Sequence, residues 1–334
     1  MNRFSYARAS DVSQAIQQHR SNGAAAFIAG GTNLVDLWRE NVAHPQLVID
    51  INGLPLRQIE PTATGGLKIG ALVTNSAAAY DATIGARYPL LAKAILAGAS
   101  PQIRNVASVG GNLLQRTRCL YFYDAGTRCN KREPGTGCPA MEGVNRMHAI
   151  LGASEHCIAV HPSDMCVALA ALDATVHLCG PEGSRVLPFA EFHRLPGDTP
   201  HLDTNVREDE LITAVELPKQ GFAEHHAYVK VRDRASYAFA LVSVALGLEL
   251  DGDTIVNAHC ALGGVAHKPW RNADAEASLR GKPLTVDTVR DFATDLLREA
   301  RGRRGNAFKI ELTARAIERA FAMAAQRSLK EPAR

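Results

Sequence analysis

A chain of 334 residues with 46% apolar and 21% charged residues has the composition of an ordinary folded protein and room for two or three domains. Its formal net charge of +3 gives no electrostatic reason to expect nucleic acid or a membrane surface as a partner. The best apolar stretch, residues 239–250, is too short to span a bilayer, so no membrane span is expected. The N-terminus lacks the apolar segment of a signal peptide, which predicts a cytoplasmic protein unless a partner with an export signal carries it to the periplasm.

The N-terminal half of the sequence alternates between short apolar strands and turns. Strands are predicted at residues 27–30, 47–51 and 67–74, and a short helix should follow the first of them. Leucine and isoleucine recur at helical spacing over residues 86–99, which predicts one helix there. A glycine-containing turn at 108–113 then leads into a stretch without regular patterning.

Regular patterning resumes in the second half. An Asp-capped helix that leads into a strand is predicted over residues 161–178, and an edge or terminal strand closed by a proline over 211–218. Beyond a boundary at 219–224, strands are followed by two amphipathic helices, predicted at 285–299 and 306–324. This order of elements indicates an α+β fold with mixed strands.

The segment FIAGGTNL, residues 27–34, places two glycines, a threonine and an asparagine between a predicted strand and a predicted helix. Glycine lets backbone N–H groups approach a phosphate closely, and the start of the following helix favours negative charge. The spacing differs from the G-x-G-x-x-G of Rossmann units, so a nicotinamide site is not indicated. Taken alone, the segment is either a phosphate-binding turn or a tight connection between strand and helix.

Six segments spread over nearly the whole chain carry a resemblance to a known family. They are AGGTNL (29–34), IGALVT (69–74), SVGGNL (108–113), HPSDMCVALAALDA (161–174), GGVAHKPWR (263–271) and NAFKIELTARAIERA (306–320). In this order they resemble the FAD-binding subunits of molybdenum hydroxylases, the superfamily of xanthine dehydrogenase, aldehyde oxidoreductase and carbon monoxide dehydrogenase. The resemblance implies an α+β fold with a two-subdomain FAD-binding domain of the p-cresol methylhydroxylase/vanillyl-alcohol oxidase type over residues 1–220. A C-terminal sheet-and-helix domain is implied over residues 225–330.

The resemblance also implies where FAD binds. The first glycine turn would hold the pyrophosphate, the second would line the flavin, and Asp164 would hydrogen-bond the ribityl or adenosine end. Ile212 and Lys230 are implied by their strand positions, and Tyr237 stands where family members often have an aspartate. The implied FAD-binding residues are Phe27, Ile28, Ala29, Gly30, Gly31, Thr32, Asn33, Leu34, Ser108, Gly111, Asn112, Asp164, Ile212 and Lys230.

Four of the seven cysteines, Cys119, Cys129, Cys138 and Cys157, lie in one stretch of about residues 116–160 without helix or strand patterning. Clustered cysteines in a chain without a signal peptide point to metal or redox chemistry rather than to disulfides. Their spacing matches neither the paired C-x2-C of zinc ribbons nor the cysteine run of bacterial ferredoxins. An iron–sulfur cluster, a structural zinc ion and free thiols all remain open on spacing alone. Because the stretch separates two flavin-contacting segments, it should fold beside the flavin.

Some members of the family carry a [4Fe–4S] cluster on the flavin subunit, among them three-subunit bacterial aldehyde oxidoreductases of the periplasmic type and 4-hydroxybenzoyl-CoA reductase. The segment QRTRCLYFYD around Cys119 resembles the aldehyde oxidoreductase form. The resemblance therefore implies FAD and a [4Fe–4S] cluster as cofactors, with the four cysteines as the cluster ligands. Since four cysteines complete a cluster, we expect the nearby His148, His156 and His161 to be hydrogen-bonding or loop residues.

The implied function is that of an electron-transfer flavoprotein subunit of a molybdenum-dependent aldehyde oxidoreductase. In such a heterotrimer a large partner carries the molybdenum cofactor, a small partner carries [2Fe–2S] clusters, and FAD passes electrons to oxygen, a quinone or ferredoxin. The sequence offers no Ser–His–Asp set and no paired carboxylates, and no catalytic residue is expected. The alternatives are a flavin subunit of another molybdenum hydroxylase, acting on xanthine or an aromatic acyl-CoA, and a self-contained flavin oxidase or reductase with a zinc-stapled loop.

Overall fold

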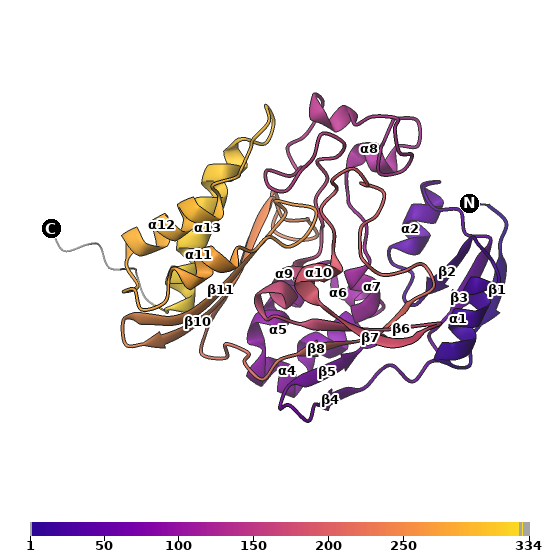
Figure 1. Ribbon diagram of the computed structural model, residues 1–334, viewed down its shortest axis with the longest axis horizontal. Helices are drawn as coiled ribbons and strands as arrows, with labels where there is room; N and C mark the ends of the chain where they lie inside the picture. Colours follow the sequence, from indigo (N-terminus) through magenta and orange to yellow (C-terminus); the bar gives the residue numbers. More distant parts are fainter. Residues whose placement is uncertain (1, 327–328, 330–334) are drawn as a thin grey trace.

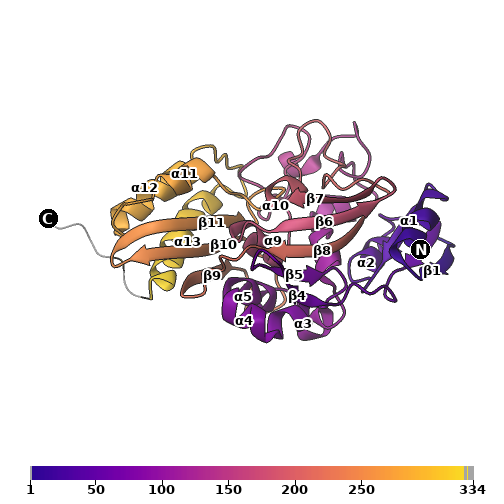
Figure 2. The same cartoon turned by 60° about the horizontal axis from the view of Figure 1, so that its bottom comes forward.

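The computed structural model describes residues 2–326 and residue 329. Its three sheets lie one after another along the long axis of the molecule, each packed against helices (Figures 1 and 2). No helix among the described residues is long and apolar enough to cross a membrane.

The N-terminal lobe is a three-stranded parallel sheet in the order β1-β3-β2. Its elements are β1 (Ser5–Arg8), α1 (Val12–Arg20), β2 (Ala25–Ile28), α2 (Leu34–Arg39) and β3 (Leu47–Asp50). Parallel neighbours need crossover connections, and α1 and α2 supply them. Ala15 and Ile49 share a core with Leu72 and Leu211 of the middle region, so the lobe that carries the turn between β2 and α2 is packed against the middle sheet.

The middle of the molecule is a five-stranded antiparallel sheet in the order β4-β5-β8-β6-β7. Its strands are β4 (Ile59–Pro61), β5 (Leu67–Gly70), β6 (Thr175–Gly180), β7 (Gly183–Pro188) and β8 (Leu211–Leu217). The strand predicted over 211–218 as an edge or terminal strand is β8, and an edge position is wrong because β5 and β6 pair with its two sides. The proline after β8 ends this central strand without interrupting its pairing.

Short helices pack against the middle sheet. They are α3 (Asn75–Tyr80), α4 (Ala82–Arg87), α5 (Pro89–Ala97), α6 (Pro101–Arg104), α7 (Val109–Leu113), α9 (Asp164–Ala171) and α10 (Phe189–Phe192). The single helix predicted over 86–99 is instead the end of α4 followed by α5, because Pro89 cannot continue a helix but is well suited to begin one. Ile69 and Val215 of the sheet share one core with Leu91 of α5.

The C-terminal unit is an antiparallel sheet with β10 at its centre and helices packed against it. Its elements are β9 (His225–Val231), β10 (Val242–Asp251), β11 (Thr254–Gly263), α11 (Ala273–Ala277), α12 (Val286–Leu296) and α13 (Phe308–Ala324). The two predicted amphipathic helices are confirmed as α12 and α13. Leu246 of β10 and Ile317 and Phe321 of α13 are fully buried in the core between them.

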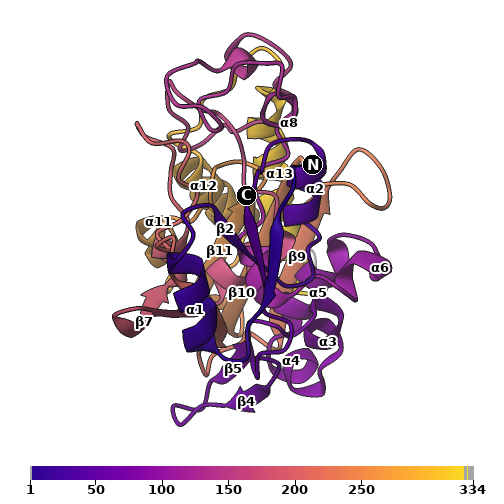
Figure 3. The same ribbon diagram turned by 90° about the vertical axis from the view of Figure 1, so that its right-hand side faces the viewer.

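Residues 116–160, here called the cysteine loop, connect α7 to α9 and have little regular structure. Their helical segments are α8 (Leu120–Tyr123) and a 3-10 helix (Pro139–Met141). Figure 3 shows the segments around α8 at the top of the molecule, on one side of its long axis. The backbone N–H of Arg116 donates to Asn33 Oδ1 of the N-terminal lobe at 3.1 Å, and Asn306 Nδ2 of the C-terminal unit donates to the carbonyl oxygen of His148 at 3.2 Å. The cysteine loop therefore bridges the first and last units of the chain.

Candidate cofactor site

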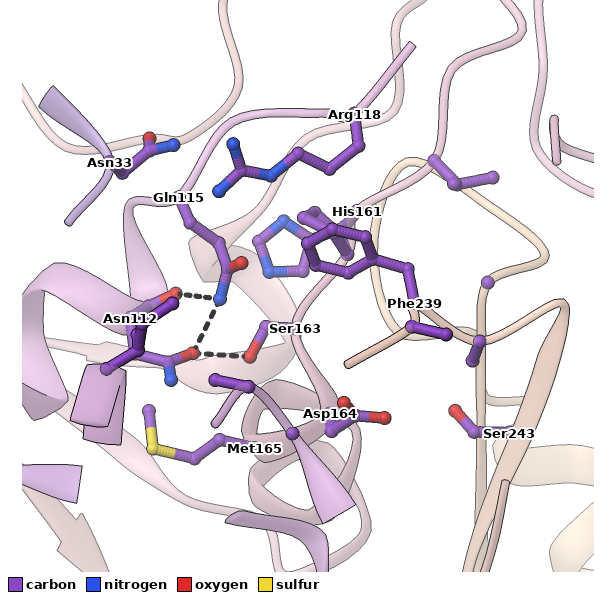
Figure 4. Close-up of a pocket in the computed structure, with 18 of the residues that line it drawn as sticks. Asn33, Asn112, Gln115, Arg118, His161, Ser163, Asp164, Met165, Phe239 and Ser243 are labelled. Atoms are coloured by element: carbon purple, nitrogen blue, oxygen red, sulfur yellow. Dashed lines mark hydrogen bonds between the residues drawn. The ribbon is translucent and has the colours of Figure 1, made fainter. Parts of the chain in front are cut away.

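A cavity of about 680 Å³ lies where the N-terminal lobe, the helices of the middle sheet and the C-terminal sheet meet. Its size falls within the range of about 300–1,000 Å³ that is typical of ligand and cofactor sites. Thr32 and Asn33 reach it from the turn after β2, Asn112 from α7, Asp164 from α9 and Lys230 from β9. Figure 4 shows Asn33, Asn112 and Asp164 around this space. Polar groups from distant parts of the sequence thus converge on one cavity.

The turn between β2 and α2 has no room for additional side chains. A Cβ atom on Gly30 would lie 2.0 Å from the carbonyl oxygen of Val106, and Gly31 has a φ of +70°, a backbone conformation that favours glycine. The side-chain nitrogen of Asn33 is buried on the cavity wall, and within the described residues it has no hydrogen-bond partner. A buried donor without an acceptor is costly, so a bound acceptor such as a phosphate oxygen suits this position.

Asn112 is the centre of a hydrogen-bond network on the cavity wall (Figure 4). Its Oδ1 accepts hydrogen bonds from Ser163 Oγ at 2.6 Å and from Gln115 Nε2 at 2.8 Å, which fixes the orientation of the amide. Ser108, by contrast, is not among the lining residues. Its Oγ accepts a hydrogen bond from the backbone N–H of Gly111 at 3.2 Å and so caps the start of α7. Ser108 therefore shapes the turn that positions Asn112.

Asp164 is held in a buried group of hydrogen bonds. Its Oδ2 pairs with Lys230 Nζ at 2.8 Å, and its Oδ1 accepts from the hydroxyl of Tyr228 at 2.6 Å. Burial, together with the adjacent carboxylate, raises the pKa of Tyr228 well above its usual range, so its hydroxyl stays a neutral donor. The sequence reasoning missed Tyr228. Its position two residues before Lys230 on β9 places both side chains on one face of the strand, and this spacing is the signal that could have found it.

The residues predicted to bind FAD divide into two groups. Those that line the cavity are Thr32, Asn33, Gly111, Asn112, Asp164 and Lys230. The other predicted residues do not line the cavity. They lie in β2 and the turn after it, at the cap of α7 and in β8, and are Phe27, Ile28, Ala29, Gly30, Gly31, Leu34, Ser108 and Ile212. Ile212 is 4% exposed in the core of the middle sheet and does not reach the cavity, because β8 lies at the centre of that sheet.

The sequence reasoning also missed several residues of the wall. Arg118 and Phe239 line the cavity, and the guanidinium carbon of Arg118 lies 5.3 Å from the centre of the Phe239 ring. Tyr237, in the place of the family's aspartate, lines the cavity as well and is 58% exposed. These side chains come from irregular segments, where no periodic pattern marks which residues will face a cavity.

The four cysteines Cys119, Cys129, Cys138 and Cys157 line one small cavity within the cysteine loop. The structure therefore brings all four together, although 38 residues separate the first from the last in sequence. Burial, with a smaller contribution from neighbouring cysteines, raises the pKa of Cys119 to about 11 and that of Cys157 to about 12. Without a bound cation these two thiols keep their protons at neutral pH.

The larger cavity and the cysteine cavity share part of their walls. Thr117, Cys119 and His148 line both of them. His148 Nε2 lies 3.1 Å from Cys119 Sγ. A group held by the cysteines would thus be separated from the larger cavity by little more than these side chains.

A buried set of charges lies beside the cysteine cavity. Lys131, which is 3% exposed, donates from Nζ to Asp203 Oδ1 at 2.5 Å and to the carbonyl oxygen of Pro200 at 2.7 Å. Arg116 Nε pairs with the other oxygen of Asp203 at 2.6 Å. Although burial opposes the effect, these two cations hold the pKa of Asp203 well below its usual range. The set has one positive charge more than negative charge, which favours an anionic group nearby.

Cys166 lies apart from the four loop cysteines. With His161 and His193 it forms a group whose ligand atoms all lie within 4.8 Å of one another. The two imidazole rings have centres 4.2 Å apart, and burial lowers the pKa of both, so both rings are neutral at neutral pH. Within the described part of the chain no other three His, Cys, Asp or Glu ligand atoms come this close together. Hence no three of the loop cysteine sulfurs lie within 4.8 Å of one another.

Two family models match consecutive parts of the chain. Residues 2–220 match the family described as FAD binding domain in molybdopterin dehydrogenase, and residues 226–324 match CO dehydrogenase flavoprotein C-terminal domain. The chain belongs to the family of FAD-binding subunits of molybdenum hydroxylases. It is a flavoprotein subunit of an oxidoreductase. The predicted fold, an α+β FAD-binding domain followed by a C-terminal sheet domain, is confirmed.

Individual relatives are similar to this chain over nearly its whole length. The aldehyde oxidoreductase FAD-binding subunit PaoB of Escherichia coli strain K12 is 49% identical over 97% of this chain and 99% of its own. The glyceraldehyde dehydrogenase medium chain of Sulfolobus acidocaldarius is 30% identical over 87% of this chain and 86% of its own. Among solved structures, carbon monoxide dehydrogenase of Hydrogenophaga pseudoflava matches with a TM-score of 0.76 at 25% identity and covers 98% of this chain and 99% of its own. These matches do not favour a self-contained flavin oxidase.

Proposed function

We propose that this chain is the electron-transfer subunit of a molybdenum-dependent aldehyde oxidoreductase, with FAD in the larger cavity and a [4Fe–4S] cluster on Cys119, Cys129, Cys138 and Cys157. The names of two relatives support aldehydes as the substrate class of the whole enzyme, because PaoB belongs to an aldehyde oxidoreductase and the Sulfolobus chain to a glyceraldehyde dehydrogenase. A large partner subunit would hold the molybdenum cofactor and a small one [2Fe–2S] clusters. The acceptor of the electrons would be oxygen, a quinone or ferredoxin, in the cytoplasm or, with an exported partner, in the periplasm.

The observation that carries the proposal is the wall shared by the two cavities. Cys119 and His148 lie on both, so groups bound on the two sides would lie close together. When bound, FAD supplies exchange between two-electron and one-electron transfer, and a [4Fe–4S] cluster supplies one-electron transfer. Because the wall is made of packed side chains, no movement of the chain is needed to bring the two groups together.

The separation of the cysteine sulfurs favours a cluster over a single zinc ion. Zinc–sulfur bonds of about 2.3 Å in a tetrahedron place the sulfurs about 3.8 Å apart. Among the described residues these sulfurs do not form a group of three ligand atoms within 4.8 Å of one another, so they are not arranged as a preformed tetrahedral zinc site. The buried cation of Lys131 lowers the cost of thiolate formation at Cys157. This charge would offset part of the negative charge of a cluster and its thiolates.

The chain's own residues supply binding and electrostatics for FAD. The unpartnered amide of Asn33, held by the closely packed turn at Gly30 and Gly31, would suit a pyrophosphate oxygen. Asn112, fixed by its two hydrogen bonds, keeps its Nδ2 group as a donor for the bound cofactor. Asp164 keeps acceptor capacity beyond its bonds to Tyr228 and Lys230, because an ionised carboxylate has about four lone-pair sites.

The test is a spectrum and metal analysis of the chain purified without oxygen. We expect flavin absorbance together with a broad shoulder in the blue–violet region that dithionite bleaches, and iron in the protein. Cys129→Ser should remove the iron and the shoulder while FAD stays bound. The matched control is Cys179→Ser, because Cys179 is a half-buried cysteine of β6, outside the cysteine loop. This variant should keep both the iron and the shoulder. Zinc in place of iron, or unchanged iron in Cys129→Ser, would contradict the cluster assignment.

A test of the substrate class requires the assembled enzyme. The complex with its molybdenum and [2Fe–2S] partner subunits should reduce an artificial acceptor with aldehydes as electron donors. Activity with xanthine or an aromatic acyl-CoA in place of aldehydes would instead support the alternative that this chain is the flavin subunit of another molybdenum hydroxylase. This measurement is independent of the cluster test, because it concerns the partner that holds the molybdenum.

A further inference from the structure

Two buried histidines from distant parts of the chain approach two of the four loop cysteines. His148, within the cysteine loop, places Nε2 3.1 Å from Cys119 Sγ, and His267, in the segment after β11, places Nε2 3.3 Å from Cys157 Sγ. The two rings are 4% and 8% exposed. Their contacts therefore lie in a region of low dielectric, where a hydrogen bond to a charged sulfur is strengthened.

The position of the proton on each ring follows from the surroundings of its two nitrogens. Within the described part of the chain, Nδ1 of both His148 and His267 is buried and has no hydrogen-bond partner. A cysteine sulfur that binds a metal is a thiolate, which can accept a hydrogen bond but cannot donate one. A proton on Nδ1 alone would leave a buried donor unsatisfied and point a lone pair at a thiolate. In both rings Nε2 must therefore carry a proton, and this holds whether the ring is neutral or charged.

The backbone holds the two histidines in fixed relative positions. Lys309, which is fully buried, donates from Nζ to the carbonyl oxygen of His148 at 2.8 Å and to that of Gly264 at 2.5 Å. The Nζ group of one lysine thus ties together the segments that carry the two rings. The backbone N–H of Ile150 also donates to the carbonyl oxygen of Val265 at 2.9 Å. These bonds join the cysteine loop to the C-terminal unit directly beside the cysteines.

We propose that His148 and His267 are positioning residues that donate N–H···S hydrogen bonds to Cys119 and Cys157 and thereby raise the reduction potential of the cluster. The proposal rests on the proposed [4Fe–4S] site. A donor to a ligand sulfur withdraws electron density from the cluster and stabilises its reduced, more negative form. His148 acts on Cys119, which lines both cavities, so this donor would lie between the cluster site and the larger cavity.

The test is a reductive titration of the cluster, followed by electron paramagnetic resonance, in the full chain purified without oxygen. His148→Leu and His267→Leu remove the donor. Each should lower the ratio of reduced to oxidised cluster at a fixed potential about tenfold, which corresponds to about 59 mV for a one-electron couple. His148→Gln supplies an amide N–H and should recover most of the wild-type potential. The matched control is His156→Leu, because His156 also lines the cysteine cavity but directs Nε2 to Asp198 at 3.5 Å.

The outcomes separate this proposal from the one on which it rests. Absence of iron from the unaltered chain overturns both. Iron with the same potential in the two leucine variants as in the wild type overturns only the histidine proposal, and so does a shift of equal size in His156→Leu. If His148→Leu loses its cluster, His148→Gln decides: recovery of iron and potential supports the donor role. A loss of iron in His148→Gln as well overturns that role.

Discussion

Lys230 of β9 and Asp164 at the start of α9 form a buried ion pair, with 2.8 Å between Nζ and Oδ2 and side chains only 5% and 7% exposed. The pair joins the C-terminal sheet to the helix layer of the middle sheet at the wall of the cofactor cavity. Tyr228 donates to the second oxygen of the same carboxylate at 2.6 Å. One carboxylate thus fixes how the C-terminal unit sits against the FAD-binding domain and also lines the larger cavity.

Asp164→Asn should therefore weaken both the fold and FAD binding. Removal of one charge leaves the ammonium of Lys230 buried without its partner, which typically costs about 3–5 kcal/mol. The matched control is Asp233→Asn, because Asp233 lines the same cavity but pairs with Arg146 at an exposed site, where an ion pair contributes about 0–1 kcal/mol. Urea unfolding gives the stabilities, and flavin fluorescence gives the FAD dissociation constants. Equal effects of the two substitutions would contradict a special role for Asp164.

Gly30→Ala should remove FAD from the purified chain. The new Cβ would lie 2.0 Å from the carbonyl oxygen of Val106, so the turn and the segment before α7 would have to move apart. Because the same turn carries Asn33, its displacement would disturb the wall of the larger cavity, where we propose that FAD binds. Gly23→Ala is the control, since a Cβ there meets no atom within 4 Å, and its effect on stability should stay within about 0.5 kcal/mol. FAD content is measured from the absorbance ratio of flavin to protein, and a Gly30→Ala chain with full FAD content would refute the prediction.

Lys309→Met should change how stability depends on pH. Burial lowers the pKa of Lys309 from 10.5 to about 7, so between these values the unfolded chain binds a proton that the folded chain lacks. The contribution of this group to stability therefore rises with pH from about 7 to about 10 and is at its most unfavourable below pH 7. Unfolding at pH 7 and pH 9 should show a gain with pH that is smaller in Lys309→Met than in the wild type. The same gain in both chains would show that Lys309 does not titrate in this range.

Lys309→Met also removes two hydrogen bonds at every pH. The carbonyl oxygens of His148 and Gly264 would lose a buried donor, which should lower the stability by about 1–3 kcal/mol. This loss is constant with pH, so the two effects of Lys309 can be separated in a single set of unfolding curves.

Local patterns in the sequence predicted the elements whose formation depends on near neighbours. The apolar faces of α12 and α13 recur every three or four residues, and both helices form where they were predicted. The glycine turn at Gly30 and Gly31 was recognisable because only glycine allows such close backbone approach. Helix ends were less well predicted, since the apolar spacing over 86–99 continues through Pro89 although the helix does not.

The sequence by itself determined the family, the glycine turn after the first strand of the FAD-binding domain and the group of four cysteines, because each is carried by residue types at short, ordered spacings. Only the tertiary structure decided that β8 is a central strand, since its partner β5 lies about 140 residues earlier in the chain. Only the tertiary structure, likewise, placed Tyr228 on Asp164 and brought His267 to Cys157 across 110 residues. Such contacts depend on how whole sheets and loops pack against one another, and no local spacing of side chains records that packing.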